Sequence, residues 1–174
     1  MLFTAYSLGD IEGRRVVDLG CGTGILAIGA ALLGAREVEG YDLDEEALRV
    51  AEEAARELGV EERVRFSCSD VEEVKTTADT VVMNPPFGAQ RRHADLPFLK
   101  KAAEIAPVVY TFHNAVTEDY IREFLHGLRG RVTLAERCIF HLGHQFPFHR
   151  KERVELEVVL LRVEFGPEKG LSLI

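Results

Sequence analysis

The residues best suited to chemistry form the run Asn84-Pro85-Pro86-Phe87, which follows the apolar stretch from Thr80 to Met83. A planar amine is a poor nucleophile because its lone pair is delocalised into the ring. The side-chain oxygen of Asn84 and the carbonyl of Pro85 can accept both hydrogens of such an amine and turn its lone pair toward an electrophile. Phe87 can stack on a base. This acceptor motif therefore predicts group transfer by positioning, and its alternative is a tight turn after a strand.

A glycine loop, Gly20-Cys-Gly-Thr-Gly24, lies between a short apolar strand and an apolar helix. Such a loop lets a ligand approach backbone N–H groups at a helix N-terminus. The dinucleotide fingerprint needs glycine at its first, third and sixth positions, but here the sixth position is Ile25 and the third glycine comes one place early. Asp18, at the end of the strand, would also sit poorly beside a pyrophosphate. The loop therefore departs from the NAD pattern.

Two acids follow the next two predicted strands. Asp42 ends the strand that starts at Glu37, and Asp70 comes just after the strand from Val64 to Cys68. A carboxylate suits a diol because its two oxygens can accept from two hydroxyl groups. Open parallel sheets bind small molecules at the carboxyl ends of their strands. The alternative for either acid alone is a loop-capping role.

The run Val16-Val-Asp-Leu-Gly-Cys-Gly-Thr-Gly24 closely resembles the first motif of class I S-adenosylmethionine-dependent methyltransferases. The resemblance implies S-adenosylmethionine as cofactor, with Asp42 accepting both ribose hydroxyls and Asp70 accepting the adenine amino group. It also implies cofactor contacts from Gly20, Gly22, Thr23, Ile25 and Val71. Asn84 and Pro85 would then orient the acceptor amine, and Phe87 would stack on a base that must be unpaired or flipped out.

Strand-like runs alternate with helical patterns through most of the chain, which predicts a single α/β domain over residues 1–174. The predicted fold is Rossmann-like, with a mixed seven-stranded sheet, helices on both faces and a C-terminal antiparallel strand pair. Expected strands are 15–18, 37–42, 64–68, 80–83, 107–112, 132–142 and 154–165, and expected helices are 25–33, 44–58 and 117–128. Asp44 is the expected N-cap of the second helix.

The composition of 47% hydrophobic and 29% charged residues excludes intrinsic disorder, and no apolar run is long enough to span a bilayer. Three separate cysteines indicate neither a disulfide framework nor a zinc site, so we expect a cytoplasmic protein. The net charge of −8 is unevenly distributed: residues 41–75 carry 12 acids and 5 bases, whereas residues 88–153 carry 11 bases and 7 acids. The overall charge therefore does not exclude a nucleic-acid partner.

Beyond the acceptor motif, Ala94-Asp-Leu-Pro-Phe-Leu-Lys100 and Phe148-His-Arg-Lys-Glu-Arg-Val-Glu-Leu-Glu-Val158 resemble one family over nearly the whole chain. It is the N6-adenine methyltransferases of small-subunit ribosomal RNA, the methyltransferase-like protein 5 group with its archaeal relatives. The resemblance implies structured small-subunit ribosomal RNA as substrate and a small zinc-binding activator protein that pairs through a sheet edge. Family members also carry a segment before the position of Met1 that closes over the cofactor, so we expect weaker cofactor binding without that segment.

The basic residues His149, Arg150, Lys151 and Arg153 are the candidate RNA-binding surface, because basic side chains neutralise phosphates. Arg91-Arg-His93 is a second basic run near the acceptor motif, and a solvated charged loop is its alternative. His141, His144 and His149 lack a cysteine or acid to complete a ligand set, so no metal site is expected.

Other planar amines remain as alternative acceptors: adenine in DNA, guanine N2 and the amide of a protein glutamine. Protein glutamine enzymes usually carry Tyr where Phe87 stands. A further alternative is a non-catalytic cofactor-binding partner in ribosome assembly, for which the complete acceptor motif would have no use.

Overall fold

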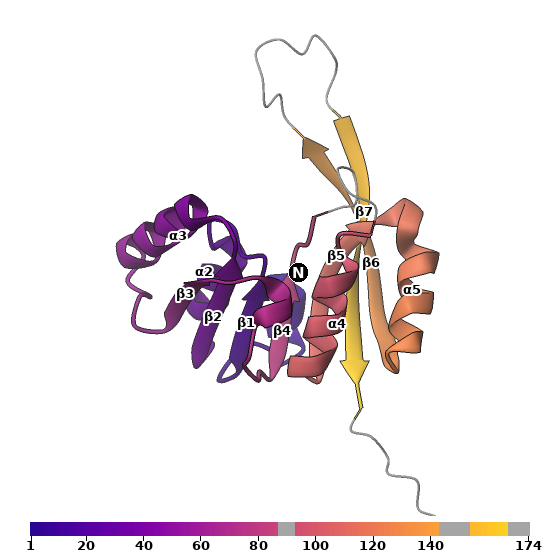
Figure 1. Cartoon of the computed structure of the whole chain (residues 1–174), viewed down its shortest axis with the longest axis horizontal. Helices are drawn as coiled ribbons and strands as arrows, with labels where there is room; N and C mark the ends of the chain where they lie inside the picture. The colour runs from indigo at the N-terminus through magenta and orange to yellow at the C-terminus, as the bar shows by residue number, and fades with distance from the viewer. Residues whose placement is uncertain (87–92, 143–153, 167–174) are drawn as a thin grey trace, which may run out of the picture.

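The computed structural model describes residues 1–86, 93–142 and 154–166, which form a mixed seven-stranded sheet with helices on both faces (Figure 1). The strands lie in the order β3-β2-β1-β4-β5-β7-β6. They are β1 (Arg15–Leu19), β2 (Glu37–Asp42), β3 (Val64–Cys68), β4 (Thr80–Met83), β5 (Val108–Asn114), β6 (Gly130–Leu142) and β7 (Val154–Phe165). The helices are α1 (Leu2–Ser7), α2 (Ile25–Leu32), α3 (Glu45–Glu57), α4 (Leu96–Ile105) and α5 (Glu118–Gly127), with short 3-10 turns η1 (Val71–Glu73) and η2 (Ala115–Thr117).

The strands β1 to β5 run parallel, whereas β7 pairs antiparallel with both β5 and β6. The predicted mixed sheet with its C-terminal antiparallel pair is therefore confirmed. Because parallel strands end at the same edge of a sheet, the glycine loop, Asp42, Asp70 and Asn84 all come to one edge.

Alternate side chains of the strands enter two hydrophobic cores, one on each face of the sheet. Val16 and Val82 pack with residues of α1, α2 and α3 on the first face. Val17 and Val81 pack with α4 and α5 on the second face. The short buried strands thus fix the positions of the loops that follow them.

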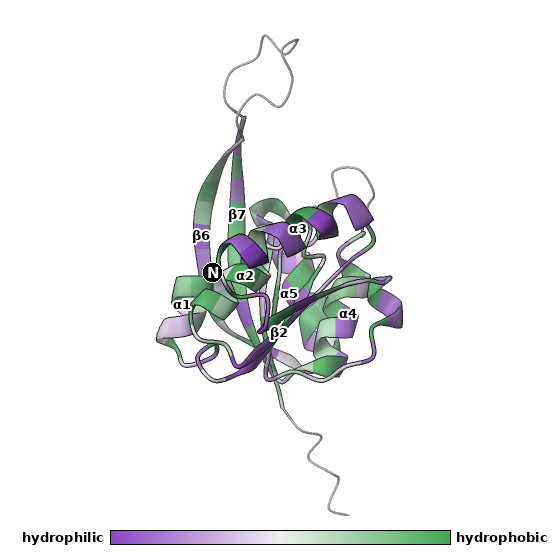
Figure 2. Ribbon diagram, turned by 90° about the vertical axis from the view of Figure 1, so that its left-hand side faces the viewer, coloured by the Kyte–Doolittle hydropathy of each residue, from purple (hydrophilic) through white to green (hydrophobic). Residues whose placement is uncertain are grey.

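The antiparallel pair extends past β5 at the edge where the parallel strands end (Figures 1 and 2). Asn114, the last residue of β5, is opposite Val158, so the start of β7 at Val154 lies beyond it. Leu142 of β6 pairs with Val154 there. Residues 143–153, which carry the predicted RNA surface, therefore leave and rejoin the described chain at the same edge as the acceptor motif.

The helix α3 begins directly after its predicted N-cap residue. Asp44 is its N-cap, and the Asp44 Oδ1 accepts from the backbone N–H groups of Glu46 and Ala47 at 3.0 and 3.1 Å. Glu45 and Arg49, one turn apart on this helix, form an ion pair at 3.8 Å. The sequence pattern predicted the end of β5 at residue 112, two residues too early. The strand continues through His113 and Asn114, which are polar but still pair with β7.

No helix within residues 1–86, 93–142 and 154–166 has the length and apolar character needed to cross a membrane. The expected cytoplasmic location stays a prediction. The outer strands of the described sheet are β3 and β6, so β6 offers an edge for strand pairing. The zinc-binding activator that would use such an edge also stays a prediction.

Candidate functional site

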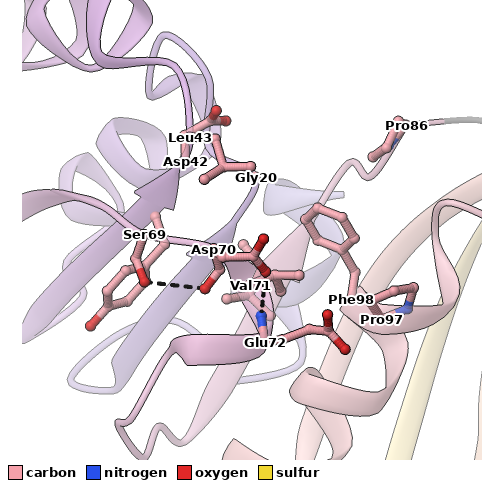
Figure 3. A pocket seen from close by; sticks show the side chains of 12 residues that line it. Gly20, Asp42, Leu43, Ser69, Asp70, Val71, Glu72, Pro86, Pro97 and Phe98 are labelled. Carbon is pink, nitrogen blue, oxygen red and sulfur yellow. Dashed lines mark hydrogen bonds between the residues drawn. The ribbon is translucent and has the colours of Figure 1, made fainter.

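A cleft of about 380 Å³ opens where the parallel strands end (Figure 3), and its size is typical of small-molecule sites. The ends of β1, β2 and β3 form one side, and the first turn of α4 forms the other. Its lining residues are Leu19, Gly20, Tyr41, Asp42, Leu43, Ser69, Asp70, Val71, Glu72, Pro86, Pro97 and Phe98. The cleft therefore joins the predicted cofactor acids to the acceptor motif.

Hydrogen bonds hold the glycine loop against the end of β2. The backbone N–H groups of Gly20 and Cys21 donate to the Tyr41 carbonyl at 2.8 and 3.0 Å. The Gly22 N–H donates to the Asp42 Oδ2 at 2.7 Å. These bonds fix the loop and the Asp42 carboxylate against each other.

Gly24 begins α2 in the left-handed region, with φ of 80°, and is closely surrounded. A β-carbon at this position would lie 2.8 Å from both the Ala51 Cβ and the Phe66 Cζ. We therefore expect Gly24→Ala to lower the free energy of unfolding by about 2–4 kcal/mol, because it adds backbone strain to a clash. Urea denaturation followed by circular dichroism measures this loss.

Gly59→Ala is the matched control for Gly24→Ala. Gly59 also has a left-handed φ, 68°, but its β-carbon would meet no atom within 4 Å. The expected loss is about 1 kcal/mol, the cost of the backbone conformation alone. Equal losses in the two variants would contradict the role of Gly24 in packing the glycine loop against α3 and β3.

Asp42 and Asp70 line the cleft with carboxylates that the backbone already orients. The Asp42 Oδ1 accepts from the Asp44 N–H at 3.0 Å, in addition to the bond from Gly22. The Asp70 Oδ1 accepts from the Glu72 N–H at 2.9 Å (Figure 3). Because each carboxylate oxygen has more than one lone pair, both acids keep acceptor capacity for a ligand.

Asp18 is a buried acid to which the sequence assigned no site role. It is 1% exposed beneath the glycine loop, and its Oδ2 accepts from the Ala27 N–H at 2.9 Å. Its Oδ1 is buried without a hydrogen-bond partner. Burial raises the Asp18 pKa from 3.8 to about 7; the Ala27 bond lowers it and the Asp42 charge adds to the rise.

The raised pKa of Asp18 predicts that stability falls as the pH rises through neutrality. Between pH 3.8 and about 7 the folded protein holds a proton that the unfolded chain has released, so folding is favoured at the acidic end. Over that range the loss for this group alone is on the order of 4 kcal/mol. Asp18→Asn cannot titrate and should show a smaller fall than the wild type between pH 5 and pH 8 in thermal melts without ligand.

Asp119→Asn, a change at an exposed acid on α5, controls for the loss of one negative charge. It should keep the pH dependence of the wild type. A wild-type profile that matches Asp18→Asn would show that Asp18 is ionised throughout and would overturn this prediction.

The acceptor motif leaves β4 beside the cleft. Pro86 lines the cleft, Pro85 is buried, and Asn84 is exposed. Phe87 lies outside the described residues. The Phe98 ring lies between the glycine loop and Pro86 (Figure 3), and its Cε1 is 3.0 Å from the place of a β-carbon on Gly20. Phe98 thus forms an aromatic wall of the cleft, next to both the glycine loop and Pro86.

The predicted cofactor residues divide into two groups. Gly20, Asp42, Asp70 and Val71 line the cleft. Gly22 and Thr23, on the adjoining loop, and Ile25, the first residue of α2, lie outside its lining, and Ile25 is 75% exposed. A cofactor contact from any of these seven residues stays a prediction.

Sequence reasoning missed the opposite wall of the cleft. Pro97 and Phe98 stand at the start of α4, and only the resemblance of Ala94–Lys100 to a known family pointed to this segment. Tyr41 was also missed; its hydroxyl donates to the Glu39 Oε2 at 2.5 Å. A strand pattern does not reveal which side chains turn toward a ligand.

The predicted RNA-binding residues His149, Arg150, Lys151 and Arg153 lie outside the described residues, as do Arg91 and Arg92. Among the described residues no group of three or more His, Cys, Asp or Glu side chains is placed to hold a metal ion. Both expectations stay predictions.

The chain is similar to two groups of known methyltransferases, over different lengths. The profile of the ribosomal protein L11 methyltransferase family (PrmA) matches residues 3–85, which hold the glycine loop and both cleft acids. Other relatives align far beyond Pro85. The rRNA N(6)-adenosine-methyltransferase METTL5 of Danio rerio is 33% identical over 169 residues, covering 93% of this chain and 81% of the relative.

A second sequence relative and a solved structure also match nearly the whole chain. The Mettl5 rRNA N(6)-adenosine-methyltransferase of Drosophila melanogaster is 35% identical over 170 residues, covering 91% of this chain and 78% of the relative. A crystal structure of a proposed RNA methyltransferase from Pyrococcus horikoshii superposes with a TM-score of 0.87 at 43% identity. That superposition covers 95% of this chain and 81% of the other.

Proposed function

The chain belongs to the METTL5-like family of class I methyltransferases, and from this premise we propose that it methylates the N6 amine of an adenosine in small-subunit ribosomal RNA. The position of the acceptor motif carries this proposal: Asn84 leaves β4 beside the cleft, and Pro86 lines it. The rRNA adenosine methyltransferases align over 91–93% of this chain, whereas a ribosomal protein L11 methyltransferase of Pectobacterium carotovorum aligns over 66% of it.

Three features of the cleft support S-adenosylmethionine as the methyl donor. Its volume of about 380 Å³ suits a small molecule, and Asp42 and Asp70 offer oriented acceptors. At Gly20 a β-carbon would lie only 3.0 Å from the Phe98 Cε1, so a side chain would crowd the cleft between the loop and Phe98. When bound, the cofactor supplies an electrophilic methyl group on a sulfonium.

The residues of the chain then act by binding and positioning. Asp42 would accept hydrogen bonds from the ribose hydroxyls, and Asp70 would accept one from the adenine amino group of the cofactor. The Asn84 side-chain oxygen and the Pro85 carbonyl would accept hydrogen bonds from the two hydrogens of the target amine and direct its lone pair in line with the S–CH3 bond. The new N–C bond would replace that S–C bond, and the amine would release one proton to water. Phe87 stacks on the target base, which must leave any helix to reach the motif.

The surrounding chain supports an RNA acceptor. Leu142 and Val154 flank the basic residues His149, Arg150, Lys151 and Arg153 and lie at the same edge as the acceptor motif. If these basic residues contact phosphates, RNA binding should weaken as the salt concentration rises.

Methyl transfer from labelled S-adenosylmethionine tests the proposed acceptor class. We would offer small-subunit RNA, duplex DNA and ribosomal proteins in parallel reactions. Label in RNA alone supports the proposal. Label in protein alone would favour an activity like that of the L11 methyltransferases, whose profile matches the cofactor half of the chain, and would contradict the proposal.

A further inference from the structure

Asp95 stands at the N-cap of α4 but does not use its side chain to cap that helix. Aspartate is among the preferred N-cap residues because its carboxylate accepts from the first free N–H groups. Here the Asp95 Oδ2 instead lies 3.0 Å from the Nδ1 of His113 on β5. The carboxylate therefore links α4 to the sheet rather than to its own helix.

His113 completes a buried polar chain between the two elements. It is 1% exposed, and its Nε2 lies 2.9 Å from the hydroxyl oxygen of Thr111, which is fully buried. Because Nδ1 faces a carboxylate, it carries a proton and donates to Asp95. Burial raises the Asp95 pKa, but the bond from His113 and the charge of His113 lower it more, so the pKa stays below its usual value.

This chain lies beside the acceptor motif. Met83, the last residue of β4, is opposite Thr111, so His113 stands two residues farther along β5, next to the segment that begins at Asn84. On the other side, Asp95 precedes Pro97 and Phe98, which line the cleft. The Asp95–His113 contact thus connects the wall of the cleft to the strand that neighbours the acceptor motif.

Two other contacts hold the same segment, residues 93–98. The His93 ring packs against the Tyr120 ring of α5, with centroids 4.9 Å apart. Phe98 lies against Gly20 of the glycine loop. The segment is therefore held by α5, by β5 and by the glycine loop, and His113 provides the one buried polar contact among these three.

A buried ionic hydrogen bond adds little stability compared with apolar residues of similar volume, because removing the charge from water is costly. Its directional geometry instead selects one arrangement of the segment. We infer that His113 is a positioning residue that acts through Asp95, holding residues 93–98 so that the Phe98 wall and the acceptor motif align the target amine with the methyl donor. This inference rests on the proposed function.

The test compares three variants: His113→Phe removes both ring nitrogens, His113→Asn keeps a donor near the position of Nδ1, and Thr111→Val removes only the hydroxyl. We expect His113→Phe to lower kcat about 10- to 100-fold. Its Kd for S-adenosylmethionine should stay within about threefold, because Asp42 and Asp70 are unchanged. His113→Asn should recover much of the lost kcat, and Thr111→Val should have an intermediate effect.

Hydrogen exchange provides a readout that is independent of the acceptor. In His113→Phe, peptides covering residues 93–99 should exchange about tenfold faster, whereas peptides from α3 should exchange as in the wild type. All measurements use a temperature at which melting curves show each variant to be folded. A purely structural role would raise exchange across the sheet and would leave kcat unchanged at that temperature.

The inference is overturned if folded His113→Phe keeps the kcat and the exchange pattern of the wild type. That outcome leaves the proposed function intact as long as the wild type methylates adenosine in RNA. If the wild type methylates another acceptor, the proposed function fails. The same variants assayed with that acceptor, together with the exchange data, then still decide the role of His113.

Discussion

Asn84→Ala should lower kcat for methyl transfer at least about 1000-fold, because it removes one of the two acceptors that orient the amine. The Asn84 side chain is exposed and lies outside the lining of the cleft, so the Kd for S-adenosylmethionine should stay within about twofold. Single-turnover assays with a saturating cofactor and calorimetric titration measure the two quantities separately.

Asn84→Asp is the matched variant, because it keeps an acceptor oxygen at the same position in a side chain of nearly the same shape. It should retain more activity than Asn84→Ala. If Asn84→Ala transfers methyl groups within about tenfold of the wild-type rate, the amine is oriented by other groups, and the mechanism proposed for the acceptor motif is wrong.

The second large effect is expected at the cofactor. Asp42→Ala should raise the Kd for S-adenosylmethionine about 100-fold, because charged hydrogen bonds to two ribose hydroxyls are lost. The change also frees the Gly22 and Asp44 N–H groups that now donate to the carboxylate. At saturating cofactor, kcat should remain close to that of the wild type.

Asp44→Ala is the control for Asp42→Ala, because it removes a neighbouring acid of the same charge. The Asp44 side chain caps α3 and is absent from the lining of the cleft. Its loss should lower the free energy of unfolding by about 1 kcal/mol. The cofactor Kd should change less than about twofold. Equal losses of affinity at the two positions would indicate a general field of negative charge rather than a ribose contact.

The fold was predictable because its main signals are local. Short runs such as Val16-Val17 and Val81-Val82 alternate between the two cores, and Gly34 and Gly59 adopt the left-handed conformation after α2 and α3. The distinction between Asp44 as a helix cap and Asp42 as a cleft acid also follows from position relative to the helix start.

The rest of the site depends on contacts between residues far apart in the chain. Asp95 and His113 are 18 positions apart, and within its strand His113 has no sequence feature that marks it as a partner for Asp95. Asp18 reads as an ordinary residue at a strand end, and its unpartnered oxygen is apparent only after α2 has packed above it. Phe98 reaches the glycine loop only because α4 packs on that face of the sheet.

We propose that this chain methylates N6 of adenosine in ribosomal RNA. The most direct test is to incubate unmethylated small-subunit RNA with the protein and labelled S-adenosylmethionine, digest the RNA to nucleosides, and resolve the labelled products by chromatography and mass spectrometry. We predict label in N6-methyladenosine, absent when Asn84→Ala replaces the wild type. Label in N2-methylguanosine would contradict the claim.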